Sequence, residues 1–410
     1  MASVPGSSNT SSNRPERYRV AIPEDQLNDL KSRLARTKLP DELEGSGWNY
    51  GVPLSDIRRL IEYWKNVFDW RIQEQKLNLQ PHFHAPITVD GGHGTLDIHF
   101  THWRCQSERA IPLLFIHGWP GHFSESSKMC PLLTDSSRPG PKFHVVSPSL
   151  PNFGFSQAVS TPGFGIKQYA EICHKLMKNL GYHSYVTQGG DWGFTISRAI
   201  GMLYPESCRA SHINMVPAKP PTLLSNPWKY IKTLTTPLSR ADKNRISRHQ
   251  QFLETGTGYS VLQSTKPQTL AYALADSPVA LTAWIWEKLH DWSDNYPWTD
   301  DEILTWVSIY WFSTAGPGAS LRIYFEFNSA RDPSLSEGYF SGWVPEVKYG
   351  VAHMPGEIVD APSLWTQTLG DVIYESEAEY GGHFAAWENP EFIAEDVKNM
   401  FKGLKESIYS

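Results

Sequence analysis

The stretch Gly189-Gly190-Asp191-Trp192-Gly193 determines the predicted fold. It follows an apolar run with β-branched residues, Tyr185-Val186-Thr187, and it precedes residues 194–200, which can begin a helix. A strand, a tight glycine turn and a helix form the context of G-x-S-x-G turns, where a nucleophile is held at a strained, exposed apex. Here an aspartate fills the serine position, and a carboxylate there can form an ester with a substrate carbon. The alternative is a glycine-rich turn whose aspartate only caps the following helix.

Two further stretches favour the catalytic interpretation. His117-Gly118-Trp119-Pro120-Gly121 directly follows an apolar run of strand length, residues 111–116. In folds with a nucleophile turn, such a loop and the residue after the nucleophile each supply one backbone N–H of an oxyanion hole, which would be Trp119 and Trp192. Near the end of the chain, His383 in Gly381-Gly382-His383 fits the base in the chain order nucleophile, acid, histidine.

Segments of strand length recur along the chain, and helical patterns separate the early ones. This alternation indicates an α/β protein with a parallel sheet and helices on both faces. Residues 218–335 break the rhythm, because they are helical and rich in aromatic residues, and we expect them to form a lid over the sheet. Ser55 is the expected cap of an early helix that continues to Phe68. The predicted strands are 96–102, 111–116, 143–147, 184–188, 210–215, 347–352 and 371–376.

Composition and charge exclude several classes of protein. The 410 residues are 40% hydrophobic and 20% charged, as in a soluble globular protein, and the net charge of -6 provides no basic surface for nucleic acid. No apolar stretch approaches the roughly 18 residues that a membrane span needs. The four cysteines lack metal or redox spacing and indicate free thiols in a reducing compartment, so we expect a cytoplasmic protein.

Five histidines lie close together in the sequence at positions 82, 84, 93, 99 and 102. A metal site there is disfavoured, because no acidic third ligand stands at helical spacing and there is no HExxH motif. Side chains that alternate on half-buried strands explain these histidines adequately. We therefore expect neither a metal nor another cofactor.

The motifs HGWPG, GGDWG and GGHFAA together resemble the epoxide hydrolases of the α/β-hydrolase fold, in particular the microsomal type. Trp48-Asn49-Tyr50-Gly51 and Phe68-Asp69-Trp70-Arg71 resemble the amino-terminal domain of that type. Microsomal relatives carry an amino-terminal anchor that is not visible here, so the chain is most similar to the soluble fungal branch. The resemblance implies a disordered tail (1–15), an amino-terminal meander (16–105), the first part of the core (106–217), a helical lid (218–335) and the second part of the core (336–410).

The resemblance also implies a mechanism in which Asp191 attacks the epoxide carbon and water then hydrolyses the ester to a vicinal diol. His383 would activate the water, and Glu357 would orient the histidine, with Asp360 as the competing acid. The family opens the ring with two lid tyrosines, which match Tyr259 and Tyr324 in sequence context; both could instead simply pack the lid.

Other functions use the same nucleophile. Haloalkane dehalogenases combine an aspartate with tryptophan N–H donors for halide, for which Trp119 and Trp192 would suit, but they do not need the tyrosine pair. A biosynthetic relative would open the epoxide with an internal hydroxyl group and form a cyclic ether. Hormone receptors of this fold keep a serine, so Asp191 argues against them. Fungal relatives are often dimers, which implies a homodimer through the lid.

Overall fold

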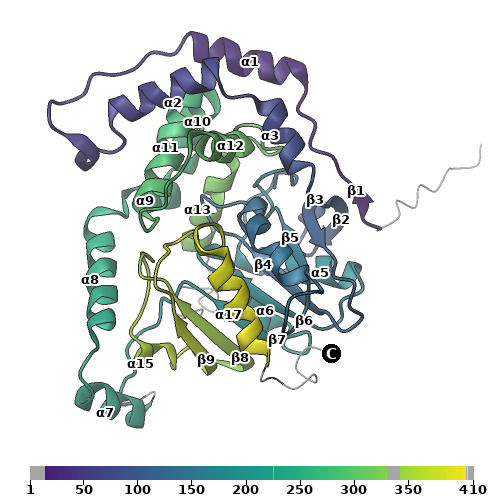
Figure 1. Ribbon diagram of the computed structural model, residues 1–410, viewed down its shortest axis with the longest axis vertical. Coiled ribbons are helices and arrows are strands. Elements are labelled where there is room, and N and C mark those ends of the chain that lie inside the picture. The colour runs from purple at the N-terminus through teal and green to yellow at the C-terminus, as the bar shows by residue number, and fades with distance from the viewer. Residues whose placement is uncertain (1–13, 225, 330–341, 403, 405–410) are drawn as a thin grey trace, which may run out of the picture.

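A computed structural model of the chain describes residues 14–224, 226–329, 342–402 and 404. Within these residues the strands join in one sheet, in the order β1-β2-β3-β5-β4-β6-β7-β8-β9 (Figure 1). Most of the predicted tail 1–15, and the predicted start of the second core part at residue 336, lie outside the described residues. The strands are β1 (Glu16–Arg17), β2 (His82–Val89), β3 (Gly94–Trp103), β4 (Ile111–Ile116), β5 (Phe143–Pro148), β6 (Tyr185–Gly189), β7 (Cys208–Ile213), β8 (Val344–His353) and β9 (Gly370–Glu377).

The sheet is antiparallel from β1 to β5 and parallel from β5 to β9. The parallel strands are apolar on both faces because helices cover both. On β4, Leu114 and Ile116 belong to the cluster of buried residues beneath α5 and α6, whereas Leu113 and Phe115 belong to the cluster beneath α4 and α17. Every predicted strand is present, with ends shifted by only a few residues. The core helices are α4 (Cys130–Thr134), α5 (Ile166–Asn179), α6 (Trp192–Leu203), α15 (Ser363–Thr366), α16 (Ala385–Glu388) and α17 (Pro390–Lys402), with the 3-10 helix η2 (Phe123–Lys128).

The amino-terminal helices pack on the lid, at the end of the molecule far from α17 (Figure 1). Arg33 forms an ion pair with Asp276 of the lid at 2.9 Å. The predicted cap Ser55 is wrong, because α2 begins at Leu54 after Pro53 and Ser55 lies inside the helix. The pattern also missed α3, which Asp69 caps by accepting the Arg71 N–H at 2.8 Å. These helices are α1 (Glu24–Ala35), η1 (Gly47–Tyr50), α2 (Leu54–Asn66) and α3 (Trp70–Leu77).

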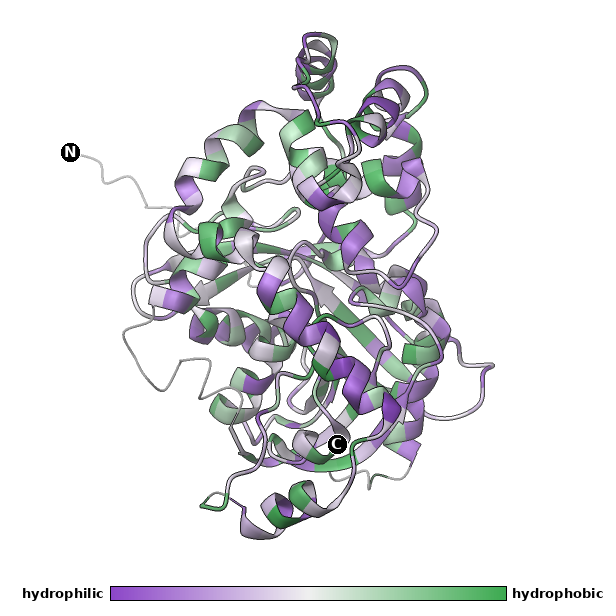
Figure 2. Cartoon of the chain, turned by 90° about the vertical axis from the view of Figure 1, so that its left-hand side faces the viewer, coloured by the Kyte–Doolittle hydropathy of each residue, from purple (hydrophilic) through white to green (hydrophobic). Residues whose placement is uncertain are grey.

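The described residues of the predicted lid region form helices joined by loops, without a strand among them. Its central helices α11 and α12 pack on each other and contact α2, so the lid lies between the amino-terminal helices and the sheet. Figure 2 shows apolar and polar residues mixed along the helices at the upper end of the molecule, as is typical of amphipathic helices. The lid helices are α7 (Pro227–Thr235), α8 (Arg240–Thr255), α9 (Gly258–Thr265), α10 (Pro267–Asp276), α11 (Pro278–Asp291), α12 (Asp300–Trp311), η3 (Ala319–Leu321) and α13 (Arg322–Ser329).

Candidate active site

The turn between β6 and α6 places Asp191 at a strained apex. Asp191 has φ 50° and ψ −130°, a conformation that a residue with a side chain rarely adopts. Gly193 makes the turn possible, because a Cβ atom there would lie 2.8 Å from the carbonyl carbon of Ile116. The strand–turn–helix context predicted from the sequence is therefore present around Asp191, whose side chain is 17% exposed.

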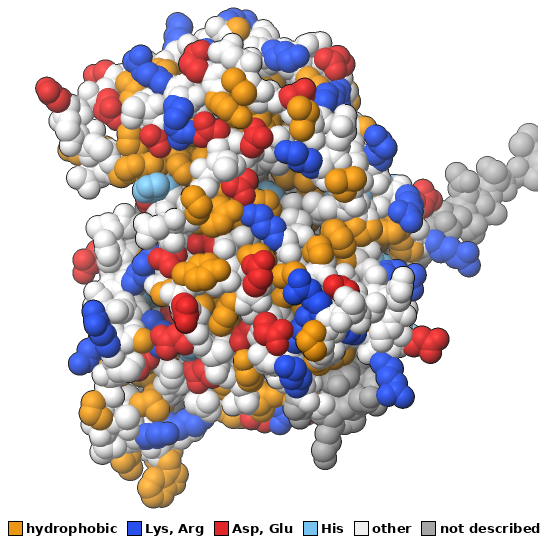
Figure 3. Space-filling view, in the orientation of Figure 1, with side chains coloured by type: hydrophobic (Ala, Val, Ile, Leu, Met, Phe, Trp, Pro, Cys, Tyr) orange, Lys and Arg blue, Asp and Glu red, His pale blue; other side chains and the backbone are white. Residues whose placement is uncertain are grey.

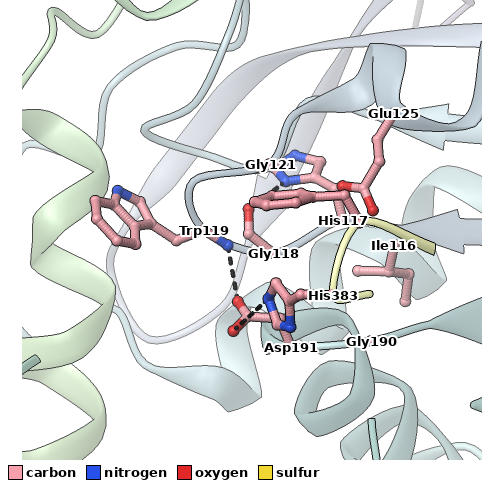
Figure 4. A pocket seen from close by; sticks show the side chains of 10 residues that line it. Ile116, His117, Gly118, Trp119, Gly121, Glu125, Gly190, Asp191 and His383 are labelled. Atoms are coloured by element: carbon pink, nitrogen blue, oxygen red, sulfur yellow. Dashed lines mark hydrogen bonds and ion pairs between the residues drawn. The ribbon is translucent and has the colours of Figure 1, made fainter. Parts of the chain in front are cut away.

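The two oxygens of the Asp191 carboxylate have different surroundings (Figure 4). Oδ1 accepts a hydrogen bond from the backbone N–H of Trp119 at 2.8 Å. Oδ2 lies 3.6 Å from Nε2 of His383. Trp192 is the first residue of α6, where backbone N–H groups lack intrahelical acceptors. The Trp119 N–H thus contacts Oδ1 directly, and Trp192 directly follows Asp191 in the chain.

His383 is held between two carboxylates. Its Nδ1 lies 2.8 Å from Oε1 of Glu357, and its backbone N–H donates to the carbonyl of Trp292 at 2.8 Å. Burial lowers the pKa of the imidazole, but the charges of Glu357 and Asp191 outweigh it and raise the pKa well above its ordinary value. The resting site therefore favours an imidazolium whose Nδ1–H donates to Glu357.

Glu357 and Asp360, the two acids left open by the sequence, occupy different environments. Oε1 of Glu357 accepts from the backbone N–H of Ile358 at 2.8 Å as well as facing His383. Asp360 instead lies 2.8 Å from Nδ1 of His353 and 3.0 Å from Nε of Arg245. Only Glu357 of the two contacts His383, and Asp360 belongs to an ion cluster that joins α8 to the loop after β8.

The two lid tyrosines gather around Trp119. The Tyr259 ring stacks on Trp119 with centroids 5.2 Å apart, and the Tyr324 ring meets Trp119 edge-on at 5.8 Å. Burial, and after it the charge of Asp191, raises the pKa of the Tyr259 phenol, and burial raises the pKa of Tyr324 well above its ordinary value. Both phenols are therefore proton donors at neutral pH. The Tyr259 and Tyr324 rings also lie 5.7 Å apart, so the two phenols are neighbours in the lid.

A small cavity lies on the other side of Asp191, where Figure 4 shows Glu125 far from the Trp119 side chain. The centre of a water molecule can occupy about 10 Å³ of this cavity, so the cavity has room for about one water molecule. Burial raises the pKa of the Glu125 carboxyl to about 8, and Gly121 leaves room for it, since a Cβ there would lie 2.5 Å from Glu125 Oε2. The cavity is lined by Ile116, His117, Gly118, Trp119, Gly121, Glu125, Gly190, Asp191, His383 and Phe384.

The sequence patterns missed Glu125 and Trp292. Glu125 stands four residues after Gly121 in the predicted oxyanion loop, so its proximity to that motif was the available signal. Trp292 packs its ring 5.1 Å from the His383 ring and accepts the His383 N–H through its carbonyl. No sequence motif marks Trp292, because its contact with His383 depends on how the lid folds back.

The clustered histidines form hydrogen bonds with neighbouring strands and loops of the sheet. His82 Nδ1 lies 2.9 Å from His99 Nε2, and His99 Nδ1 lies 2.8 Å from the Ser149 hydroxyl. His84 contacts the Asp97 carboxylate on the neighbouring strand at 3.0 Å. Within the described part of the chain, no group of three or more His, Cys, Asp or Glu side chains could hold a metal ion.

These features define a class of protein: an α/β-hydrolase with an aspartate at the apex of the turn after β6, a histidine–carboxylate pair beside it and two tyrosines in the lid. Comparisons with known proteins agree. Residues 15–126 match the model of the epoxide hydrolase N terminus, and residues 111–295 match that of the alpha/beta hydrolase fold.

Solved structures and a curated relative extend the comparison over nearly the whole chain. Epoxide hydrolase 1 of Sus scrofa is 35% identical over 98% of this chain and 91% of its own. The epoxide hydrolase of Aspergillus niger has a TM-score of 0.80 at 31% identity, covering 95% of this chain and 97% of that chain. Juvenile hormone epoxide hydrolase from Bombyx mori has a TM-score of 0.82 at 29% identity, covering 94% and 93%.

The chain belongs to the epoxide hydrolases, and it is an enzyme of the α/β-hydrolase fold. The predicted family and fold are confirmed. No helix among the described residues is long and apolar enough to cross a membrane.

Proposed function

We propose that Asp191 opens the epoxide by attacking a ring carbon through Oδ2 and forming an ester with the enzyme. The orientation of the carboxylate carries this proposal: Oδ1 is held by the Trp119 N–H at 2.8 Å, which leaves Oδ2 for attack. A carboxylate needs no proton removed before it attacks. Oδ1 then becomes the ester carbonyl oxygen, already placed for the step in which an oxyanion forms.

Ring opening breaks a carbon–oxygen bond and leaves an alkoxide on the substrate. A phenol proton from Tyr259 or Tyr324 neutralises that alkoxide, and the raised pKa values keep both phenols protonated until the oxygen charge develops. The contact of both tyrosine rings with Trp119, whose N–H holds Oδ1 of Asp191, supports this role.

Hydrolysis of the ester completes the reaction. A water molecule gives one proton to Nε2 of His383 while its oxygen attacks Cγ of Asp191, and the N–H groups of Trp119 and Trp192 hold the resulting oxyanion on Oδ1. Collapse breaks the bond between Cγ and Oδ2, Nε2 of His383 returns its proton to Oδ2, and the diol leaves with the oxygen that Asp191 contributed. The proton left on the new Asp191 carboxyl group restores the tyrosine that gave its proton to the alkoxide. Glu357, 2.8 Å from Nδ1, orients the imidazole and stabilises its charge.

Formation of the ester itself prepares His383 to act as a base. In the resting site the charges of Glu357 and Asp191 raise the pKa of His383. Alkylation removes the charge of Asp191, so the pKa of His383 falls and the neutral imidazole becomes more populated. Before alkylation, protonated His383 pairs with the Asp191 carboxylate. After alkylation, the neutral imidazole can accept a proton.

Glu125 faces the cavity in which the attacking water would sit. As a half-buried carboxyl group with its pKa raised to about 8, it is neutral at pH 7 and can both donate to and accept from water. We assign it to positioning that water. A neutral acid suits this place, because a second negative charge beside the ester would repel the developing oxyanion.

The substrate is a lipophilic epoxide, since the walls toward the lid are aromatic: Trp119, Trp192, Tyr259, Tyr324 and Trp292. The protein works in the cytoplasm, consistent with four free, buried cysteines. The homodimer through the lid stays a prediction from the family resemblance.

A single turnover in H₂¹⁸O tests the ester. With enzyme in excess, the diol of the first turnover should carry no label, and the peptide containing Asp191 should gain ¹⁸O. Labelled diol and unlabelled protein would mean that water attacks the oxirane directly. A cyclic ether in place of the diol would reveal the cyclase chemistry, and halide release from a haloalkane would reveal the dehalogenase chemistry.

A further inference from the structure

The helix α7 turns its apolar stripe outward. Trp228, Ile231 and Leu234 recur every three residues and therefore share one side of the helix, and they are 81%, 45% and 68% exposed. Leu224, which precedes the helix by one turn, is 98% exposed. A surface helix ordinarily buries its apolar stripe against the core. The reversed orientation therefore marks a surface for a partner.

The opposite side of α7 is fixed to the core. Nζ of Lys229 donates to the carbonyl of Gln367 at 2.7 Å and lies 5.3 Å from the Trp343 ring. The preceding segment is tied down as well, because the Thr368 hydroxyl donates to the carbonyl of Lys219 at 3.2 Å. Figures 1 and 2 show α7 at one extreme end of the molecule, away from the amino-terminal helices. The stripe is thus presented on a protruding and anchored element.

The charged residues near the stripe in the sequence are all basic. Residues 217–241 contain Lys219, Lys229, Lys232 and Arg240 but no aspartate or glutamate, although the whole chain carries a net charge of -6. In Figure 3 hydrophobic and basic side chains gather together at the lower end of the molecule, over α7. Apolar side chains flanked by cations are complementary to a surface with an apolar interior and an anionic outer layer.

A second copy of the chain is a poorer match. A two-fold interface places the same patch against itself, so Lys232 beside the stripe would face its own copy and repel. A protruding stripe fits a protein partner only if that partner has a matching groove, whereas the interface of a lipid bilayer can deform around the stripe. Tryptophan, leucine and isoleucine on one side with lysine on the other is the composition of helices that lie in the membrane interface.

We propose that α7 docks the enzyme on an anionic lipid bilayer, with Leu224, Trp228, Ile231 and Leu234 in the interface and Lys232, one turn after Trp228, at the headgroups. This surface would bring the enzyme to where lipophilic epoxides concentrate, an advantage that rests on the proposed function. The docking itself does not, because it can be measured without substrate.

The test is co-sedimentation of the full-length protein with vesicles of phosphatidylcholine alone or with about 30% phosphatidylserine. Wild type should bind the anionic vesicles. The double variant Leu224→Ser/Trp228→Ser should bind about tenfold less, because it removes two apolar side chains from the interface. The variant Lys232→Glu should bind about 25-fold less, since one basic residue near the surface contributes about fivefold and charge reversal counts twice. Tyr272→Ser, which removes an aromatic residue that is 70% exposed on α10, is the matched control and should bind like wild type.

All variants should hydrolyse a water-soluble epoxide at the wild-type rate, which shows that they fold and separates this test from the proposed mechanism. The proposal is overturned if wild type ignores anionic vesicles, if it binds neutral vesicles equally well, or if the stripe variants bind like wild type. It is also overturned if light scattering shows a dimer that the stripe variants disrupt while vesicle binding is unchanged.

Discussion

Gly118→Ala should disable the enzyme by moving the Asp191 carboxylate. A Cβ atom at position 118 would lie 2.6 Å from Cγ of Asp191, whereas carbon atoms in contact are normally at least about 3.5 Å apart. One of the two must therefore move by about 1 Å. The Trp119 N–H is the next residue on the same loop and would shift with it. A misplacement of about 1 Å costs on the order of 10²-fold in rate.

The assay is the single-turnover rate of ester formation, measured with enzyme in excess over an aryl epoxide. Thermal unfolding in parallel reports whether the variant folds. Gly165→Ala is the matched control, because a Cβ there meets only the end of the Gln168 side chain, at an ordinary 3.8 Å. A folded Gly118→Ala protein that forms the ester at the wild-type rate would refute the close packing of Gly118 against Asp191.

Four more predictions follow from the contacts in the site. Tyr259→Phe and Tyr324→Phe should each slow ester formation by about 10²–10³-fold, and the double variant by more; unchanged rates of alkylation would remove the tyrosines from the mechanism. Glu357→Gln should leave ester formation nearly intact but slow ester hydrolysis by on the order of 10⁴-fold, seen as accumulated adduct in quenched-flow samples. Hydrolysis by wild type should decline above about pH 8, as Glu125 ionises, and Glu125→Gln should lose this decline; an identical alkaline limb would contradict its role. Burial lowers the pKa of His353, but Asp360 and Glu375 raise it to about 9. The pKa of histidine in the unfolded chain is about 6.5, so the ion pairs of protonated His353 stabilise the fold fully below that pH, and this stabilisation is lost as pH rises through 9. Between pH 7 and pH 9.5, Tm should therefore fall by less in His353→Gln than in wild type.

The strands and the turn around Asp191 could be predicted from local sequence, because each depends on residues that are close together in the chain. The run 111–116 is apolar throughout, as a strand buried on both faces must be, and the glycines around Asp191 are required by the backbone of the turn itself. The position of Glu357 beside His383 also followed from motif context and strand order, and the structure brings the two within 2.8 Å.

Contacts that depend on how the lid closes were not accessible from local patterns. Trp292 reaches His383 only because the segment after α11 folds back onto the core. The Ser55 cap failed for a different reason: Pro53 fixes φ and can stand directly before the first turn, so the helix begins one residue before the expected cap. The outward stripe of α7 escaped notice because periodicity tells which residues share a side, and not which side is buried.

The central claim is that the reaction passes through an ester on Asp191, and His383→Gln tests it most directly. Attack by the carboxylate needs no base, whereas hydrolysis of the ester needs His383, so this variant should consume about one equivalent of epoxide and then stall. Intact-protein mass spectrometry should show the added mass of the whole epoxide, and peptide mapping should place it on the peptide containing Asp191. A folded His383→Gln protein that stays unmodified after long incubation with an epoxide that wild type hydrolyses would contradict the covalent mechanism.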